Sequence, residues 1–285
     1  MTRRLDTSST LSSVPICVTI AGSDSSGGAG IQADLKAFSA LKTYGASVIT
    51  AITAQNTRGV TDVMDMTPAI IRGQMEAVFS DLNVAAVKIG MLSQPETIET
   101  VMDGLSHFQG PIVLDPVMVA KSGNRLLSET AIDVLRQKLI PLATLITPNR
   151  PEAACLLDMD EAKSDEEAEA QGRALLRLGA KAVLMKGGHA EGEICTDLLI
   201  TADAPTFAIS APRIHTKNTH GTGCTLSAAL ATKLGHGLDL KQAFEEAHDY
   251  LHQAILAADQ LTIGSGHGPV HHFYELWTNP SQVAP

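Results

Sequence analysis

Short apolar runs alternate along the chain with longer segments whose apolar residues recur every three or four positions. The short runs are rich in β-branched residues and predict buried strands, whereas the longer period predicts helices. Strands are expected at residues 16–21, 47–54, 86–89, 112–114, 145–147 and 182–185. Helices are expected at residues 30–44, 68–82, 94–108, 225–235 and 240–261, with another that ends near residue 178. This alternation predicts an α/β fold of three α/β/α layers, with a mainly parallel central sheet and helices on both faces.

Three further segments predict strands at the margins of the sheet. Residues 60–66 fit a short edge strand, and residues 193–200 and 206–210 fit a strand pair at one edge. No internal repeat or low-complexity linker interrupts the pattern. We therefore expect one domain over residues 15–285, preceded by a disordered, mainly polar tail at residues 1–14.

Composition narrows the range of functions. The net charge of −10 argues against a nucleic-acid groove and against binding to an anionic membrane surface. No apolar run approaches the ~18 residues of a membrane span, and Arg3-Arg4 leads into a polar stretch rather than the apolar core of a secretion signal. The four cysteines are widely spaced without a CxxC pair, which favours reduced thiols in a cytoplasmic protein.

The segment NTHGTGCTLSAALAT at residues 218–232 predicts a glycine-rich turn that runs into a helix. Gly221 and Gly223 allow the backbone to point its N–H groups at one place, and Thr222 lies between them. The free N–H groups and dipole of a helix start form an anion site, most often for phosphate. Cys224 follows directly, where a helix start is expected to lower the pKa of a thiol. The alternative is that Cys224 is a small buried residue closing a helix–sheet contact.

A second glycine-rich loop, GSDSSGGAG, follows the first strand at residues 22–30. Its spacing matches neither GxxxxGK[ST] nor GxGxxG, so it could be only a flexible turn. Asp24 and Asp34 flank the loop and favour a role facing a ligand, and we place Asp34 with the substrate-binding residues. Gln55 and Asn56 follow the second strand, where neutral amides suit an uncharged polar heteroaromatic ring or, equally, a capped turn.

Charged residues follow three later strands. Asp115 is placed to hold Mg²⁺ or to cap a turn, and Lys186 could contact a nucleotide phosphate or lie on the surface. Asn149 and Glu152 are spaced to share one face of a helix start, although capping explains the same pattern. An anion turn, two carboxylates and a lysine at one sheet edge together indicate phosphoryl transfer.

Several motifs carry a resemblance to a known family: AGSDSSGGAGIQADLKAFSALKTYGASVITAITAQNTRGV, KIGML, LITPNRPEA, VLMKGGH, TKNTHGTGCTLSAALA and GPVHHF. In this order they resemble the hydroxymethylpyrimidine/phosphomethylpyrimidine kinases of thiamine biosynthesis, within the ribokinase-like superfamily. The similarity extends from residue 16 to residue 273. The glycine turn alone points only to the superfamily, whereas the first motif narrows the resemblance to this kinase family.

The resemblance implies ATP- and Mg²⁺-dependent phosphorylation of 4-amino-5-hydroxymethyl-2-methylpyrimidine, then of its monophosphate, by a homodimer. Gln55 would bind the pyrimidine edge, and the ring would be lined by Gly22, Ala29, Met91 and Val117. Gly221, Thr222 and Gly223 would form the anion hole beside Cys224, which replaces the superfamily's usual aspartate base. ATP would be bound by Asn149, Lys186 and Lys217, and Mg²⁺ by Glu152 and Asp115.

Two other functions remain open at this point. Pyridoxine or pyridoxal kinases phosphorylate a similar ring, and a non-catalytic pyrimidine sensor could keep the same scaffold. A dinucleotide-dependent oxidoreductase is disfavoured because no GxGxxG follows a strand. Residues 120–124 form a polar loop that could fold over the site.

Overall fold

The computed structural model describes residues 14–118, 127–188 and 192–277. The tail expected to be disordered (apart from residue 14) and the loop at residues 120–124 lie outside these ranges. Within them, no helix is long and apolar enough to cross a membrane.

Nine strands of the described chain form one sheet in the order β3-β2-β1-β4-β5-β6-β7-β8-β9. Their bounds are β1 Ile16–Asp24, β2 Tyr44–Asn56, β3 Gly59–Asp65, β4 Val84–Ile89, β5 Ile112–Leu114, β6 Leu145–Ile146, β7 Ala182–Met185, β8 Ile194–Thr201 and β9 Phe207–Pro212. The six strands from β2 to β7 in this order pair in parallel. β3 pairs antiparallel at one edge, and β8 and β9 pair antiparallel at the other, which confirms the predicted margins.

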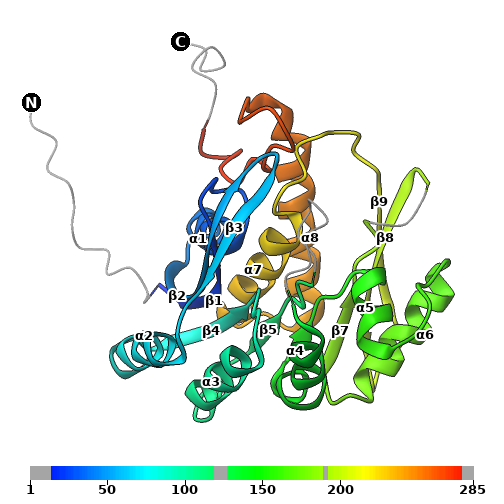
Figure 1. Cartoon of the computed structure of the whole chain (residues 1–285). Coiled ribbons are helices and arrows are strands. Elements are labelled where there is room, and N and C mark those ends of the chain that lie inside the picture. Colours follow the sequence, from blue (N-terminus) through cyan, green and yellow to red (C-terminus); the bar gives the residue numbers. More distant parts are fainter. Residues whose placement is uncertain (1–13, 119–126, 189–191, 278–285) are drawn as a thin grey trace, which may run out of the picture.

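Helices cover both faces of this sheet, which confirms the three-layer prediction (Figure 1). One face carries α1 Gly30–Ala40, α7 Thr222–Gly235 and α8 Leu240–Leu256. The other carries α2 Pro68–Asp81, α3 Pro95–Leu105, α4 Glu129–Val134, α5 Arg150–Leu157 and α6 Asp165–Leu176. Each face buries its own apolar core against the β-branched strands, so the sheet is apolar on both sides, as parallel sheets require.

Helix starts follow the local sequence, whereas α1, α3 and α8 end earlier than the apolar pattern predicts. Thr67 caps α2 by accepting the Ile70 N–H, and Pro68 fills its first turn, as its fixed φ and missing N–H allow. α8 ends at Leu256, earlier than the apolar pattern predicts, and a 3₁₀ turn follows at Ala258–Gln260. The sequence analysis assigned no element to α4 or to the π-helical turn Leu135–Leu139 behind it.

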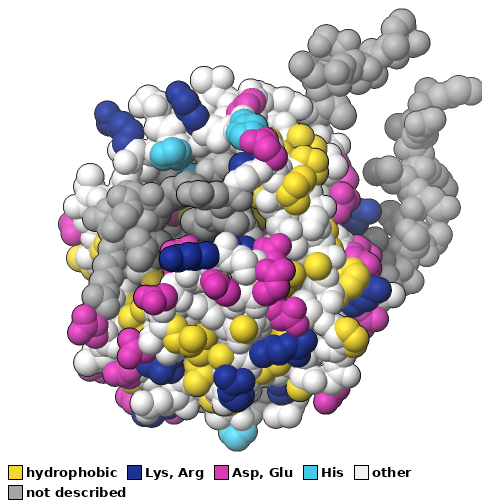
Figure 2. All heavy atoms as spheres, turned by 90° about the vertical axis from the view of Figure 1, so that its right-hand side faces the viewer, with side chains coloured by type: hydrophobic (Ala, Val, Ile, Leu, Met, Phe, Trp, Pro, Cys, Tyr) yellow, Lys and Arg dark blue, Asp and Glu magenta, His cyan; other side chains and the backbone are white. Residues whose placement is uncertain are grey.

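The order in which the chain adds strands to the sheet reverses near its middle. β1 is followed by its neighbour β2 on one side, whereas β4 lies on its other side, so the strand order reverses between β1 and β4. Ligands of open parallel sheets bind beyond the carboxyl ends of the strands at such a switch point. On the face shown in Figure 2, acidic and basic side chains are interspersed, and no patch of one sign dominates that face.

Candidate active site

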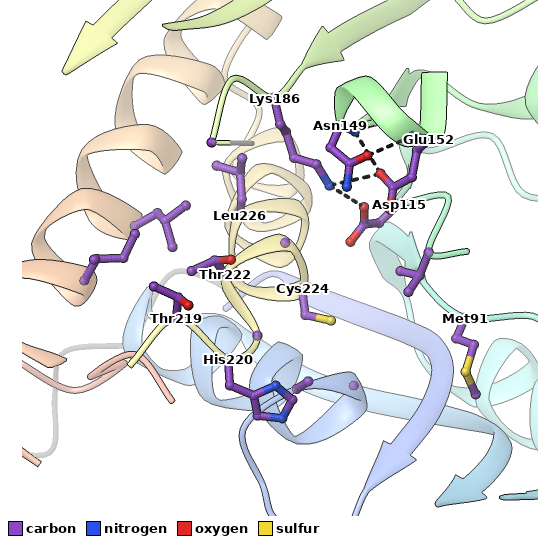
Figure 3. Close-up of a pocket in the computed structure, with 18 of the residues that line it drawn as sticks. Met91, Asp115, Asn149, Glu152, Lys186, Thr219, His220, Thr222, Cys224 and Leu226 are labelled. Atoms are coloured by element: carbon purple, nitrogen blue, oxygen red, sulfur yellow. Dashed lines mark hydrogen bonds and ion pairs between the residues drawn. The ribbon is translucent and has the colours of Figure 1, made fainter. Parts of the chain in front are cut away.

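A cavity of about 960 Å³ opens at the carboxyl ends of the parallel strands. It is lined by the loop after β1, the ends of β2, β4, β5 and β7, the start of α5 and the turn before α7. Figure 3 shows that these elements turn their polar side chains toward a common space. The topology thus brings together residues that are far apart in the sequence.

The turn before α7 is built for close backbone approach. Gly221 caps the helix with φ +80, and a Cβ there would lie 1.9 Å from the Gly28 carbonyl oxygen. The Thr225 N–H makes the first helical bond, to Gly221 O. Thr222, Gly223 and Cys224 therefore occupy the first turn, whose N–H groups have no helical partner. The helix begins at Thr222 rather than at Thr225, so the predicted anion turn is the helix start itself.

Cys224 lies in the cavity wall, but its predicted acidity is wrong. Burial raises the pKa of the thiol to about 11, although Lys88 and the Gly30 N–H act in the opposite direction. The helix start does not compensate for lost hydration here, because desolvation disfavours the thiolate. The unliganded protein therefore holds Cys224 as a neutral thiol at pH 7.

Lys186 links the two carboxylates that the sequence places after β5 and in α5. Its Nζ lies 2.9 Å from Asp115 Oδ1 and 3.7 Å from Glu152 Oε2 (Figure 3). Asn149 caps α5 by accepting the Glu152 N–H, while Glu152 accepts the Asn149 N–H. The capping alternative therefore holds for this pair, and the cap also keeps Glu152 beside Lys186. A Cβ on Gly223 would lie 3.4 Å from both Lys186 Nζ and Asp115 Oδ2, so this charged group borders the anion turn.

The two carboxylates differ in how readily they ionise. Burial would raise the pKa of Asp115, but Lys186 and Lys88 outweigh it and hold that pKa below its ordinary value. Burial raises the pKa of Glu152 to about 7, and the Asp115 charge adds to the rise. Among the described residues, no group of three or more His, Cys, Asp or Glu side chains could hold a metal by itself. Two oxygen donors beside a phosphate site do fit Mg²⁺, which takes few carboxylates and completes its shell with water and phosphate.

Asp24 organises the loop after β1. Its carboxylate accepts the N–H groups of Ser26, Gly28 and Ala29, and it lies 2.8 Å from His220 Nε2. Burial alone would raise the pKa of Asp24, but the hydrogen bonds from His220 and Ser26 lower it to about 2. The hydrogen bond between His220 and Asp24 thus ties the loop after β1 to the turn before α7.

Asp34 does not line this cavity, contrary to its assignment to the substrate. It is fully buried in α1, accepts the Thr19 hydroxyl and pairs with Lys88 at 2.8 Å. Burial would lower the pKa of Lys88, but the Asp34 carboxylate outweighs it and raises that pKa above its ordinary value. Lys88, and not Asp34, reaches the cavity wall.

The other predicted substrate residues come together. Gln55, Gly22, Ala29, Met91 and Val117 all line the cavity. Met91 packs on Gly22 so closely that a Cβ there would lie 2.5 Å from its methyl carbon. Lys217 is exposed and is not among the described residues that line the cavity.

Several cavity residues had no predicted role, among them Lys88, His220 and Thr53. Lys88 is a lone charge within the apolar run AAVKIG, and a buried charge in such a run is itself a signal. His220 lies within the glycine turn, where only the glycines and the thiol had been assigned roles. Thr53 is an ordinary strand residue, and nothing in its local sequence marks it.

The comparisons with known proteins agree with one another. A family model described as phosphomethylpyrimidine kinase matches residues 24–271. A hydroxymethylpyrimidine/phosphomethylpyrimidine kinase of Rhizobium meliloti is 56% identical over 92% of this chain and 98% of that protein. Its namesake from Escherichia coli is 52% identical over 91% of this chain and 98% of that protein.

Solved structures extend this likeness to three dimensions. A phosphomethylpyrimidine kinase from Clostridium difficile is 45% identical with a TM-score of 0.75, covering 85% of this chain and 99% of that one. An ADP complex of Bacillus subtilis pyridoxal kinase is 35% identical with a TM-score of 0.86, covering 93% and 100%. With its motifs, its sheet order and its cavity, the chain belongs to the phosphomethylpyrimidine kinase family, which has the ribokinase-like fold.

Proposed function

We propose that this enzyme uses ATP to phosphorylate 4-amino-5-hydroxymethyl-2-methylpyrimidine, and then the resulting monophosphate, in the cytoplasm. One observation carries the proposal: the amide turn that starts α7 lies in a single cavity between Gln55 on one side and the Lys186 group on the other. A ring alcohol bound at Gln55 and a nucleotide phosphate bound at Lys186 would thus meet at the turn. Phosphoryl transfer needs such positioning and charge neutralisation above all.

Each part of the cavity has a distinct task in this proposal. The N–H groups of Thr222, Gly223 and Cys224 stabilise the charge on the migrating phosphoryl group. Lys186 neutralises the phosphates, and Asn149 keeps Glu152 directed at the same place. Asp115 and Glu152 would hold Mg²⁺, which would offset part of the negative charge of the phosphates. Similar pyridoxal kinases have been solved as ADP and AMP-PCP complexes, which supports a nucleotide as the phosphoryl donor.

The direct test supplies the purified protein with ATP, Mg²⁺ and the hydroxymethylpyrimidine, and follows monophosphate and diphosphate by chromatography. We expect both products in sequence, with ADP formed for each transfer. Nucleotide turnover that does not depend on the pyrimidine, or no turnover at all, would contradict the proposal and favour a non-catalytic sensor.

Pyridoxal is the second candidate substrate. Pyridoxal kinases of Bacillus subtilis and Staphylococcus aureus are 35% and 29% identical to this chain and share its fold. The curated relatives named as pyrimidine kinases are more similar, at 56% and 52%. We therefore propose pyridoxal as a side substrate, and the ratio of kcat/KM for the two alcohols decides which is preferred.

A homodimer completes the proposal. Ile52 in β2 and Met64 in β3 face each other across the pair, yet they are 47% and 67% exposed. Apolar side chains grouped on an exposed edge favour contact with another protein surface. A second copy of the chain is the partner that the family resemblance suggests.

A further inference from the structure

The side-chain amide of Gln55 lies between two fixed polar groups. As placed in the structure, Gln55 Oε1 lies 3.0 Å from Thr53 Oγ1 and Gln55 Nε2 lies 3.3 Å from His220 Nε2. The backbone of Gln55 is held too, since its N–H donates to Ser25 Oγ and its carbonyl accepts the Ser25 hydroxyl. The side-chain amide can still rotate by a half-turn, which exchanges the positions of Oε1 and Nε2. Hydrogen-bond partners decide that choice.

The His220 end of the amide faces a hydrogen. His220 Nε2 lies 2.8 Å from Asp24 Oδ2, and the same carboxylate oxygen accepts the Gly28 and Ala29 N–H groups. An ionised carboxylate only accepts, so Nε2 carries the hydrogen and donates it to Asp24. The imidazole is also packed on Gly28, where a Cβ would lie 2.3 Å from the ring. An NH₂ group beside this N–H would set donor against donor, whereas an oxygen there shares the hydrogen with Asp24 as the longer acceptor of a three-centre bond.

The Thr53 end of the amide faces a lone pair. Thr53 Oγ1 lies 2.9 Å from the Ser23 carbonyl oxygen and 3.0 Å from the Gln55 amide. A hydroxyl has one hydrogen, and the carbonyl can only accept it. The hydroxyl therefore donates to Ser23 and accepts from Gln55. Both ends select the amide turned by a half-turn from its placed orientation, with Gln55 Nε2 toward Thr53 and Oε1 toward His220.

We propose that Thr53 and His220 lock the polarity of the Gln55 amide and thereby determine which donor–acceptor pattern on a substrate ring is accepted. The inference rests on the proposed function, in which Gln55 binds the ring edge. The locked amide keeps one N–H and one oxygen lone pair for the cavity. An aminopyrimidine edge offers an amino donor beside a ring-nitrogen acceptor and pairs with both.

A 4-oxo ring in its N3–H form offers the reverse pattern, an acceptor beside a donor. It would pair only with a reversed amide, which the lock prevents. The ring cannot turn over to compensate, because its hydroxymethyl group must reach the turn before α7. Without the lock, a glutamine would rotate and bind either ring, so the specificity arises from the neighbours of Gln55.

The experiment compares kcat/KM for the 4-amino alcohol and its 4-oxo analogue, with ATP as donor. We expect the wild-type enzyme to prefer the amino ring by at least about 10³-fold in kcat/KM. A site that hydrogen-bonds its substrate discriminates strongly against a ring that leaves its buried polar groups unpaired. Thr53→Val and His220→Asn should each lower this ratio, and the double variant should lower it by about tenfold or more, the effect of one hydrogen bond. Part of the change should be a gain in kcat/KM on the oxo ring.

Thr50→Val is the matched control. Thr50 is a buried hydroxyl on the same strand that donates to a carbonyl, that of Met91, and it does not contact Gln55. Its variant should keep the wild-type ratio, so a fall in ratio there would overturn the proposal. If the Thr53 and His220 variants lose kcat/KM equally on both rings, the lock is wrong but the proposed function stands. A wild-type enzyme that phosphorylates neither ring would overturn the proposed function and the lock together.

Discussion

Cys224 shows how burial can reverse the chemistry expected from a position in the sequence. A cysteine at a helix start is expected to ionise readily, yet loss of hydration dominates here and raises its pKa to about 11. If the thiolate is the base for the alcohol, the first transfer should therefore accelerate as pH rises toward that value. The second transfer should not, because a phosphate monoester is already mostly dianionic above its second pKa of about 6.

This expectation can be measured as two pH profiles between pH 6 and pH 9. In the wild-type enzyme the rate of the first transfer should rise with pH, while the second stays level above pH 7. Cys224→Ala should flatten the first profile and lower it far more than the second. Parallel profiles for the two proteins, or equal losses in both transfers, would show that Cys224 serves packing or the anion turn.

Asp24 makes a second prediction at this scale. Its pKa is lowered to about 2, so its stabilising contribution is present above the unfolded value of 3.8 and is lost as pH falls toward 2. The shift corresponds to about 2 kcal/mol of unfolding free energy, at 1.36 kcal/mol per pKa unit. Urea unfolding followed by circular dichroism should show Asp24→Asn less stable at pH 7, with the difference shrinking by about that amount by pH 2.

Asp62→Asn provides the comparison, because Asp62 is exposed on β3. The Asp62→Asn substitution should change the free energy of unfolding little between pH 7 and pH 2. A difference between wild-type protein and Asp24→Asn that stays constant from pH 7 to pH 2 would contradict the role of the Asp24 charge.

At the scale of elements, the start of α7 depends on glycine more strictly than its other end. Both Gly221 and Gly237 have positive φ, +80 and +88, so alanine at either costs about 1–2 kcal/mol of backbone strain. Only at Gly221 would the new Cβ also meet backbone, since nothing lies within 4 Å at Gly237. The local sequence predicts the turn at Gly221, but only the packed neighbour makes that glycine irreplaceable.

Gly221→Ala should therefore lose activity, and Gly237→Ala should not. We expect both transfers to fall by about 10²-fold or more in Gly221→Ala, because displaced amides no longer meet the phosphoryl group. Steady-state rates and urea midpoints of the two variants separate this effect from stability. A Gly221→Ala enzyme with wild-type rates would mean that the amides do not act on the phosphate.

Elements were predicted well where apolar runs were long and poorly where packing set the ends. The strands of the parallel sheet follow from their apolar runs, since the inner strands β1, β4, β5, β6 and β7 are buried on both faces. No element was predicted at α4 and the π-helical turn Leu135–Leu139, although Ile132, Leu135 and Leu139 recur at helical spacing there and are buried in the core. Helix ends such as Leu256 depend on what packs beyond them, so periodicity overestimates α8.

For the molecule as a whole, the exposed pair Ile52 and Met64 predicts its assembly. The wild-type protein should sediment as a dimer, and Ile52→Glu should raise the dissociation constant by about tenfold or more, equivalent to about 1.4 kcal/mol. Ile194→Glu is the control, because Ile194 is an equally exposed isoleucine, at 53%, in the antiparallel pair at the other margin of the sheet. A monomeric wild-type protein, or dissociation caused equally by both variants, would contradict this interface.

The sequence by itself determined the layers and the parallel sheet, because apolar periodicity is a local property of the chain. Its glycine turns and family motifs indicated only a minority of the residues that line the cavity. Tertiary structure decided the charges and the partners: Asp34 pairs with Lys88 away from the substrate, Cys224 is a neutral thiol, and Thr53 and His220 meet Gln55. These outcomes depend on desolvation and on contacts between distant segments. Neither is encoded in the spacing of residues along one strand or helix.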